Sequence, residues 1–458
     1  LRTADAASAD TATNQVAQDV NGDGLSDVPK MRQLNLHPAV FFNPNTDFSA
    51  RVGLSEVIEN RAGGDFSAIK NGISVAHPFL EKNVQHRTSV DFSAEKTISP
   101  KNLVTMKGVW SRVEQQQSVL QNRLEGVQNQ GYAEISQNLS KADHRLVWGG
   151  TLNFSKFEPT ESTSPNLAAE TNATPGIFGQ DEWAFSKKMS AEAGFRIDHH
   201  NRAGWFWLPH LALRWTPAPS IVGRLSGGAG YKTSAVLALA DLPRELSILP
   251  KNAISGLQPE RSRSLNADIQ WKKTWAGALE IHLDQAFYGT EIQKPLNWSP
   301  ENAVFSNSDA PIKSLGTDTY LISNWRFLEL YFGYNHTEAW QTVAKQKKYV
   351  PFAPQDKIAA TLAFDFKKYG WRGGLEAARN GNQYLPSGEK APDWWFFAAS
   401  ISKKMSWGSL TLNGENLFDY RQSKKGPLFS GGILDPKFVD LWAPIDGRVF
   451  NFSVKLDF

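Results

Sequence analysis

The feature that most constrains this chain is a strict alternation of apolar and polar residues over segments of strand length. Near the end of the chain every second residue is apolar, and the residues between them are Asn, Ser, Lys or Asp. The apolar positions are Phe450, Phe452, Val454, Leu456 and Phe458. Because side chains of a β-strand point alternately to its two faces, this segment is predicted to be a strand with one apolar face.

The same alternation recurs around residues 193–197, 265–271 and 360–366. In a soluble β-sandwich the apolar faces meet in a core between two sheets. In a barrel embedded in lipid the apolar side chains face outward and the polar ones face a wet lumen. The pattern therefore favours a transmembrane barrel. The alternative, a soluble all-β binding protein, predicts solubility without detergent.

Connections between the predicted strands are of two kinds. Short turns are predicted at 99–102, 216–219 and 367–370, and long loops at 159–176, 237–256 and 422–442. Outer-membrane barrels have short turns on the periplasmic side and long loops outside the cell. With about 20 residues for each strand and its share of loop, we predict an all-β fold: a large antiparallel transmembrane β-barrel of about 20–22 strands in the complete protein.

Composition supports a barrel and excludes other classes. The 458 residues include 16 Trp, 27 Phe and 10 Tyr, which aromatic girdles at the two membrane interfaces would use. No run approaches the roughly 18 apolar residues that a spanning helix needs. The chain has 0 Cys, which excludes thiolate metal sites and cysteine nucleophiles. A net charge of +3, with no basic tract, gives no indication of a nucleic-acid partner.

Several short motifs follow one another along the chain. In chain order they are NRAGGD at 60–65, GYKTS at 230–234, VPFAPQDK at 350–357, GENLFDYRQ at 414–422, PIDGR at 444–448 and a terminal aromatic, Phe458. In this order they resemble the barrel of TonB-dependent receptors. The first motif is most similar to siderophore and cobalamin receptors. The second lacks the Pro that the family usually carries there, so the loop that follows it is expected to differ.

The resemblance implies a receptor in the outer membrane of a Gram-negative cell that imports a scarce solute, such as a ferric siderophore or cobalamin. Transport would be energised through the TonB protein acting on a plug domain. We recognise neither a plug nor a TonB-recruiting segment, so we interpret residues 1–458 as a receptor-like barrel that lacks the N-terminal plug and the first strands. The implied partners are outer-membrane lipid, TonB through a plug, and a small-molecule or metal-chelate ligand.

Two other functions would use a similar barrel. A passive porin would share every strand pattern but have no plug, and its solute flux would not depend on TonB. An outer-membrane phospholipase would need far fewer strands. Because the sequence contains no nucleophile elbow, P-loop or HExxH pattern, we expect no enzymatic activity.

The most specific chemical motif lies near the start of the chain. Asp19, Asn21, Asp23 and Asp27 have the D-x-N-x-D-G-x-x-D spacing that wraps oxygen ligands around calcium, with Gly24 at the sharp turn. At the twelfth position a Lys replaces the bidentate Glu of an EF-hand, so the predicted site would be weaker than an EF-hand. The alternative is a polar, turn-rich extracellular loop. No other cofactor is expected.

Three further patterns have simpler structural explanations. His199 and His200 are adjacent, but neighbouring strand residues point to opposite faces and could not easily bind one metal ion. The aromatic run 394–397 is better explained by a membrane girdle than by a ligand platform. We assign no role to the inward-facing charges, which are Arg196, Asp198, Asp268 and Lys455.

Overall fold

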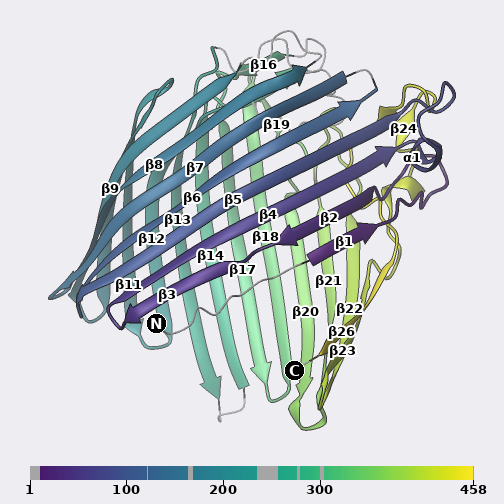
Figure 1. The fold of residues 1–458 in the computed structure, drawn as a ribbon. Coiled ribbons are helices and arrows are strands. Elements are labelled where there is room, and N and C mark those ends of the chain that lie inside the picture. The colour runs from purple at the N-terminus through teal and green to yellow at the C-terminus, as the bar shows by residue number, and fades with distance from the viewer. Residues whose placement is uncertain are drawn as a thin grey trace.

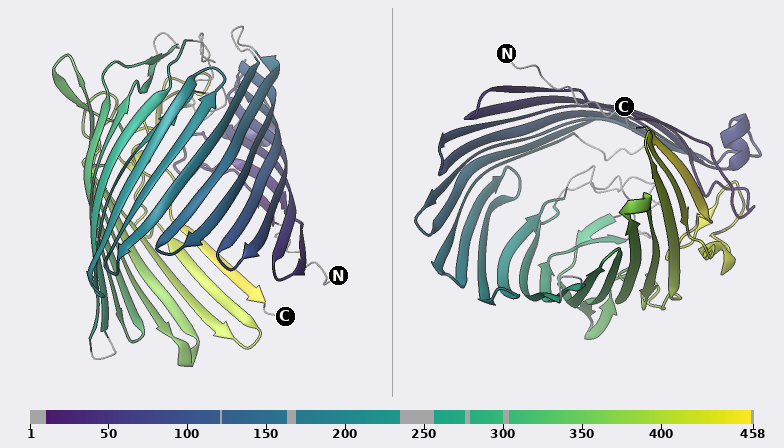
Figure 2. Two further views of the ribbon diagram at one scale, coloured as in Figure 1. Left: turned by 90° about the vertical axis from the view of Figure 1, so that its left-hand side faces the viewer. Right: turned by 90° about the horizontal axis from the view of Figure 1, so that it is seen from below.

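The computed structural model describes residues 11–120, 122–162, 169–234, 256–275, 279–299 and 304–456. One 22-stranded antiparallel sheet dominates it and curls round into a barrel (Figure 1). Seen along its axis, the sheet forms a ring (Figure 2). The predicted all-β class and large antiparallel barrel are therefore confirmed. Among the described residues, no helix is long and apolar enough to cross a membrane.

The first part of the sheet consists of β1 (Thr11–Gln15), β2 (Lys30–Leu36), β3 (Ala39–Asn45), β4 (Phe48–Gly64), β5 (Leu80–Ser99), β6 (Asn102–Val119), β7 (Asn122–Lys141), β8 (His144–Ser162), β9 (Glu170–Ser186), β10 (Met189–His200), β11 (Gly204–Ala218) and β12 (Ile221–Lys232). From β4 onward each strand pairs with the next one in sequence. β2 and β3 pair with the two halves of β4, and β1 pairs with β2.

The second part consists of β13 (Glu260–Trp275), β14 (Leu279–Gln293), β17 (Ile312–Trp325), β18 (Leu328–Val343), β19 (Gln346–Tyr349), β20 (Asp356–Phe366), β21 (Trp371–Gly381), β22 (Trp394–Met405), β23 (Gly408–Glu415) and β26 (Val449–Leu456). β15 (Leu296–Ser299) and β16 (Val304–Asn307) form a separate hairpin. At one edge of the sheet β26 pairs with β23, and within the described residues no pairing joins β26 to β1 or β3 at the other edge.

The predicted alternation decides which face of each strand meets lipid. Phe452 and Leu412 are paired across β26 and β23, and they are 65% and 50% exposed. Their neighbours along the strands are polar. In a barrel this exposure is the lipid-facing surface rather than a defect. Trp325, Trp371 and Trp407 are exposed beside the short turns, where an aromatic girdle was expected.

The three predicted short turns all connect consecutive strands, β5 to β6, β11 to β12 and β20 to β21. The last contains a short helix, η3 (Lys367–Tyr369), and ends at Gly370 with a φ of 65°. A side chain at this glycine would lie 2.9 Å from the carbonyl oxygen of Lys404, so both the conformation and the space favour glycine.

The predicted long loops differ from one another. Residues 422–442 form a loop with η4 (Gln422–Lys424), β24 (Phe429–Ser430) and β25 (Lys437–Phe438). The region 159–176 is mostly strand, because β8 runs to its residue 162 and β9 begins at 170. Residues 163–168, most of the predicted loop 237–256, and Phe458 lie outside the described residues.

A small outer core joins the early and late loops at the long-loop end of the barrel. The loop 16–29, the helix α1 (Phe66–Asn71) and the β23–β26 loop gather there, as the positions of α1 and β24 in Figure 1 show. The Arg421 guanidinium donates to the Val20 carbonyl oxygen at 3.0 Å, and the Phe79 and Phe438 rings lie 5.7 Å apart. Leu25 and Phe79 are buried in this core.

Candidate luminal site

The strands β8, β10 and β12 bring four polar side chains together on the inner face of the barrel. Phe195 on β10 is exposed on the outer face, so its neighbour Arg196 points to the lumen. We call Thr151, Arg196, Asp198 and Tyr231 the luminal cluster. Asp198 is only 3% exposed, which makes it the most deeply buried charged side chain of the cluster.

Asp198 is the centre of the luminal cluster. The Arg196 Nε lies 2.8 Å from its Oδ1 and 2.9 Å from its Oδ2, and the Tyr231 hydroxyl donates to Oδ2 at 2.8 Å. The Arg196 guanidinium also donates to Thr151 Oγ1 at 2.8 Å. A buried carboxylate needs such partners because its desolvation costs several kcal/mol. The cluster therefore neutralises its own charge.

A glycine makes room for this carboxylate. A Cβ on Gly176 of β9 would collide with Asp198 Oδ1 and lie 3.1 Å from Thr151 Oγ1. Because Gly176 has no side chain, it leaves the space that the Asp198 carboxylate occupies beside β9.

Nearer the long-loop end than the luminal cluster, polar contacts also hold the start of β9 and the end of β10 in place. The His200 Nδ1 accepts the backbone N–H groups of Arg202 and Ala203, each at 3.2 Å, which fixes the tight turn between β10 and β11. Arg202 forms an ion pair with the buried Glu170. The Phe206 ring is fully buried and stacks on Tyr231 with ring centroids 3.7 Å apart.

A pocket of about 360 Å³ opens beside these residues. Its polar lining includes Ser111, Tyr132, Asn153, Asn172, Thr174 and His200. Hydroxyl, amide and imidazole groups on a concave wall can donate and accept hydrogen bonds, while Val109 adds apolar surface. The pocket is therefore suited to a polar solute.

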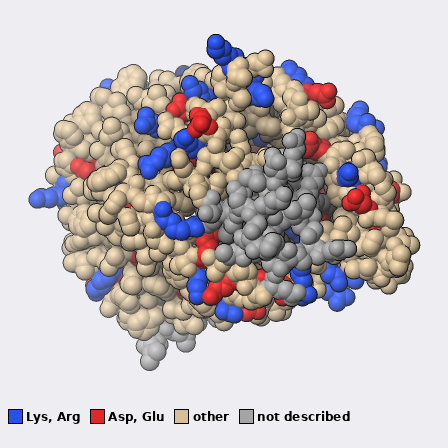
Figure 3. All heavy atoms as spheres, turned by 90° about the horizontal axis from the view of Figure 1, so that it is seen from above, with Lys and Arg blue, Asp and Glu red and all other residues tan. Residues whose placement is uncertain are grey.

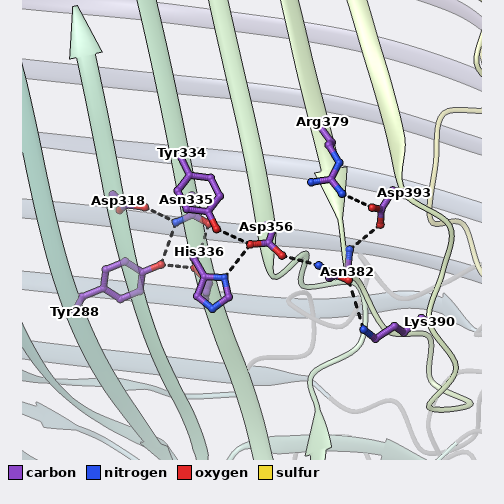
Figure 4. Close-up of polar contacts among 11 residues, drawn as sticks. Tyr288, Asp318, Tyr334, Asn335, His336, Asp356, Arg379, Asn382, Lys390 and Asp393 are labelled. Atoms are coloured by element: carbon purple, nitrogen blue, oxygen red, sulfur yellow. Dashed lines mark hydrogen bonds and ion pairs between the residues drawn. The ribbon is translucent and has the colours of Figure 1, made fainter.

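A second polar network lies further round the barrel, on β14, β17 and β18 (Figure 4). The Asn335 amide donates to the Tyr288 hydroxyl at 3.2 Å and also to Asp318. These side chains face the lumen, because the alternate residues Leu330 and Phe332 of β18 are exposed on the outside. The network extends the polar inner wall away from the pocket.

The neighbours of Asn335 point the other way. On the outer face, Asp356 accepts hydrogen bonds from the Tyr334 hydroxyl at 2.8 Å and the Asn382 amide at 2.6 Å, and His336 Nδ1 lies 2.9 Å away (Figure 4). This arrangement ties β18, β20 and the end of β21 together at the long-loop end. We assign it a structural role at the membrane border.

Among the described residues, charges of both signs lie at the long-loop end of the molecule. Seen from above, Lys and Arg are interspersed with Asp and Glu around the rim (Figure 3).

The predicted calcium ligands lie together in the loop 16–29. Asp19 accepts the backbone N–H groups of Gly22 at 2.7 Å and Gly24 at 3.0 Å, and Asp27 accepts that of Val20 at 2.7 Å. Gly24 has the positive φ, 89°, that the motif requires. In the described part of the chain no group of three or more His, Asp or Glu side chains is placed to hold one metal ion. Calcium binding by Asp19, Asn21, Asp23 and Asp27 stays a prediction.

The adjacent histidines and the aromatic run 394–397 have side chains on different faces of their strands. The His199 ring packs on Trp205 with ring centroids 4.6 Å apart, whereas His200 is buried in the turn contact described above, so the two do not converge. Trp395 is exposed on the outer face, as a girdle residue is expected to be. Trp394 instead donates its indole N–H to the Trp442 carbonyl oxygen at 3.0 Å, beneath the last loop.

The inner wall also shows what the sequence reasoning missed. Arg196 and Asp198 had been assigned no role, and they form the centre of the luminal cluster. Asp268 pairs with Arg224 on the next strand. The only sequence signal was the spacing of Arg196 and Asp198, two residues apart on one strand face, because their partners come from distant strands.

Comparison with known proteins identifies relatives of the whole arrangement. A family model described as "TonB dependent receptor-like, beta-barrel" matches residues 13–417. A search of curated proteins finds no significant match. Among solved structures, the "Copper transporter OprC" is 13% identical with a TM-score of 0.72, and the alignment covers 94% of this chain and 72% of OprC.

Two siderophore receptors are similar at the same level. The siderophore receptor PirA from Acinetobacter baumannii is 12% identical with a TM-score of 0.69, and the alignment covers 98% of this chain and 74% of PirA. The ferripyoverdine receptor of the outer membrane of Pseudomonas aeruginosa is 13% identical with a TM-score of 0.69, and the alignment covers 94% of this chain and 65% of that receptor. At these identities the likeness establishes the fold.

Proposed function

Because the chain belongs to the TonB-dependent receptor-like β-barrel family, we propose that it is the wall of a receptor that imports a scarce solute, such as a ferric siderophore or cobalamin, with energy supplied through TonB. Membership of this family places the protein in the outer membrane and among receptors and transporters rather than enzymes. The identity of the solute and the role of TonB belong to the proposal.

The observation that carries the proposal is the polar inner wall with a pocket near the long-loop end. A solute captured by the outer loops would meet Asn153, Asn172 and Thr174 there, next to the self-neutralised luminal cluster. A polar chelate could exchange its water contacts for hydrogen bonds to these groups. In this proposal a plug domain gates the lumen, TonB acts on the plug, and residues 1–458 supply the wall and loops.

The test is solute uptake by cells with and without TonB. A strain lacking the receptor is given the gene back and is supplied with a panel of radiolabelled ferric siderophores and cobalamin. We expect one solute to accumulate only when both the receptor and TonB are present. Accumulation that persists without TonB would contradict energised import and would indicate passive flux.

A pair of variants connects uptake to the pocket. Asn153→Leu removes an exposed polar group of the pocket, whereas Asn266→Leu makes the same change on the inner face of β13, outside it. We expect the first variant to weaken solute binding by about fivefold to tenfold, since one hydrogen bond contributes about 1 kcal/mol. Equal effects of the two variants would contradict the assignment of this pocket.

A further inference from the structure

A second pocket lies on the outer face of the barrel, where β2, β4 and β5 meet the loop that carries α1. Its volume is about 400 Å³. Three cations line it, Lys30, Arg32 and Lys82, and its described lining contains no Asp or Glu. We call it the outer cationic pocket.

Strand pairing brings the cations together. Ala62 on β4 lies between Lys30 on β2 and Lys82 on β5, since it pairs with both. Arg32 pairs with Asn60 one step further along the same face. Neighbouring strands are about 4.8 Å apart, so the backbones at Lys30 and Lys82 lie about 10 Å apart on either side of a small residue. This gap can admit one anionic group between them.

The pocket opens toward the membrane rather than toward the lumen. Leu34 follows Arg32 on the same face of β2 and is 38% exposed, and its partner Ile58 is 47% exposed. Two residues along a strand cover about 6.6 Å. The cations therefore lie at the upper border of the apolar outer face, on the side of the long loops, where lipid headgroups are located.

The wall opposite the cations is apolar and held in place. Ile69 and Ile73 of the α1 segment line the pocket, and Ile73 is 63% exposed. Asp65 fixes the segment, because its Oδ1 accepts the Ser67 backbone N–H at 2.8 Å and its Oδ2 contacts His77 Nδ1 at 2.7 Å. The pocket thus combines cationic and apolar surface in a preformed shape.

The cations of the pocket differ from others on the same outer face. Within the described residues, no ion pair joins Lys30, Arg32 or Lys82 to a carboxylate. Three outward cations on the following strands do have partners: Arg112 pairs with Glu114, Arg123 with Glu125, and Lys156 with Glu158. The positive charge of the pocket is therefore available to a ligand.

We propose that the outer cationic pocket binds the phosphorylated headgroup of an anionic lipid in the outer leaflet of the membrane. The phosphate lies between Lys30, Arg32 and Lys82, and an acyl chain runs down over Leu34 and Ile58. Ile73 covers the apolar part of the headgroup region. The binding depends on the outer-membrane location and not on which solute the receptor imports.

The experiment measures lipid bound to the full receptor, purified in a neutral detergent, by native mass spectrometry with added lipid A. Lipid A carries phosphate groups and acyl chains. In the variant Lys30→Gln/Arg32→Gln/Lys82→Gln we expect lipid A affinity to fall about fivefold for each charge removed. The matched control Arg112→Gln/Arg123→Gln/Lys156→Gln removes the same charge from the same face, and its affinity should stay within twofold of the unmodified receptor.

A second arm separates a lipid from a free anion. Inorganic phosphate at millimolar concentration should not displace lipid A, and Ile73→Ser should weaken lipid A binding without changing phosphate binding. Folding of every variant is checked by heat-modifiable mobility on gels. The proposal is overturned if both triple variants lose lipid equally, if neither loses it, or if phosphate alone competes. Uptake of the imported solute is measured separately, so failure here leaves the proposed transport function intact.

Discussion

The luminal cluster and the loop 16–29 both hold carboxylates out of bulk water, but they balance the charge in different ways. In the luminal cluster the Asp198 carboxylate has the Arg196 guanidinium and the Tyr231 hydroxyl within hydrogen-bond distance. In the loop, Asp27 has Asp19 and Asp23 as its charged neighbours. In the luminal cluster Arg196 supplies the positive charge that balances Asp198, whereas the charged neighbours of Asp27 in the loop are also negative.

This difference appears in the pKa of Asp27. Partial burial raises the pKa of its carboxyl above the ordinary value of 3.8, the Val20 and Asn21 backbone N–H groups lower it, and the charges of Asp23 and Asp19 raise it further. The net shift is upward. The Arg196–Asp198 pair of the luminal cluster needs no ligand to balance its charge, whereas a loop with excess negative charge gains from a cation.

The largest expected loss of stability comes from removing the carboxylate at the centre of the luminal cluster. Asp198→Ala leaves the Arg196 guanidinium without its carboxylate and removes the acceptor of Tyr231. Because Arg196 keeps some contact with water, we expect a loss of about 2–3 kcal/mol in the free energy of unfolding. Urea unfolding in lipid, followed by tryptophan fluorescence, measures it. Asp198→Asn, which keeps an acceptor, should lose less, and an unchanged midpoint for Asp198→Ala would show that the pair is not stabilising.

A smaller effect should follow from crowding the same carboxylate. Gly176→Ala places a methyl group against Asp198 Oδ1, so the carboxylate must move away from Arg196. We expect a loss of about 1–2 kcal/mol, typical of overpacking. Gly150→Ala on β8 is the matched control, because its methyl would meet nothing closer than 3.8 Å. The same urea assay distinguishes them, and equal losses would indicate a general cost of replacing strand glycines.

The strands could be predicted from the sequence because their signal is local. Alternation marked the strands around 193–197, 265–271 and 360–366, which lie within β10, β13 and β20. The short turns were equally clear. The region 159–176 was expected to be a loop because it is rich in Ser and Thr, yet strand covers most of it. Strands beyond the lipid can carry polar residues on both faces, so composition does not mark where they end.

The luminal cluster could not be predicted in the same way. Arg196 contacts Thr151, which is 45 residues away, and Asp198 contacts Tyr231, which is 33 residues away. These contacts depend on the register of β8, β10 and β12, and a slip of one residue would turn every side chain to the other face. A single sequence does not show the register between strands. The inward-facing charges could therefore be recognised, but their partners on other strands could not be predicted.

Calcium is the cation that would balance the loop. If Asp19, Asn21, Asp23 and Asp27 bind it, about 2 mM calcium should stabilise the receptor by about 0.6–1.8 kcal/mol, as expected for an extracellular site with a Kd of about 0.1–1 mM. The thermal midpoint and the resistance of the loop to protease, each with calcium and with a chelator, measure this effect. Asp19→Asn should abolish the response. Magnesium at the same concentration is the control, and an equal response to magnesium or none to calcium would leave only a polar turn.

The smallest effect tests the excess charge of the loop without any metal. A carboxyl with a raised folded-state pKa contributes stability that is fully present below its unfolded pKa, near 3.8, and is lost as the pH rises through the folded value. At neutral pH the ionised Asp27 therefore costs stability, and Asp27→Asn should raise the unfolding free energy in chelator by about 0.5 kcal/mol after allowance for solvent screening. The gain should vanish at about pH 3, where Asp27 is itself protonated. A loss at neutral pH would mean that the Val20 and Asn21 N–H groups balance the charge, as Arg196 does in the wall.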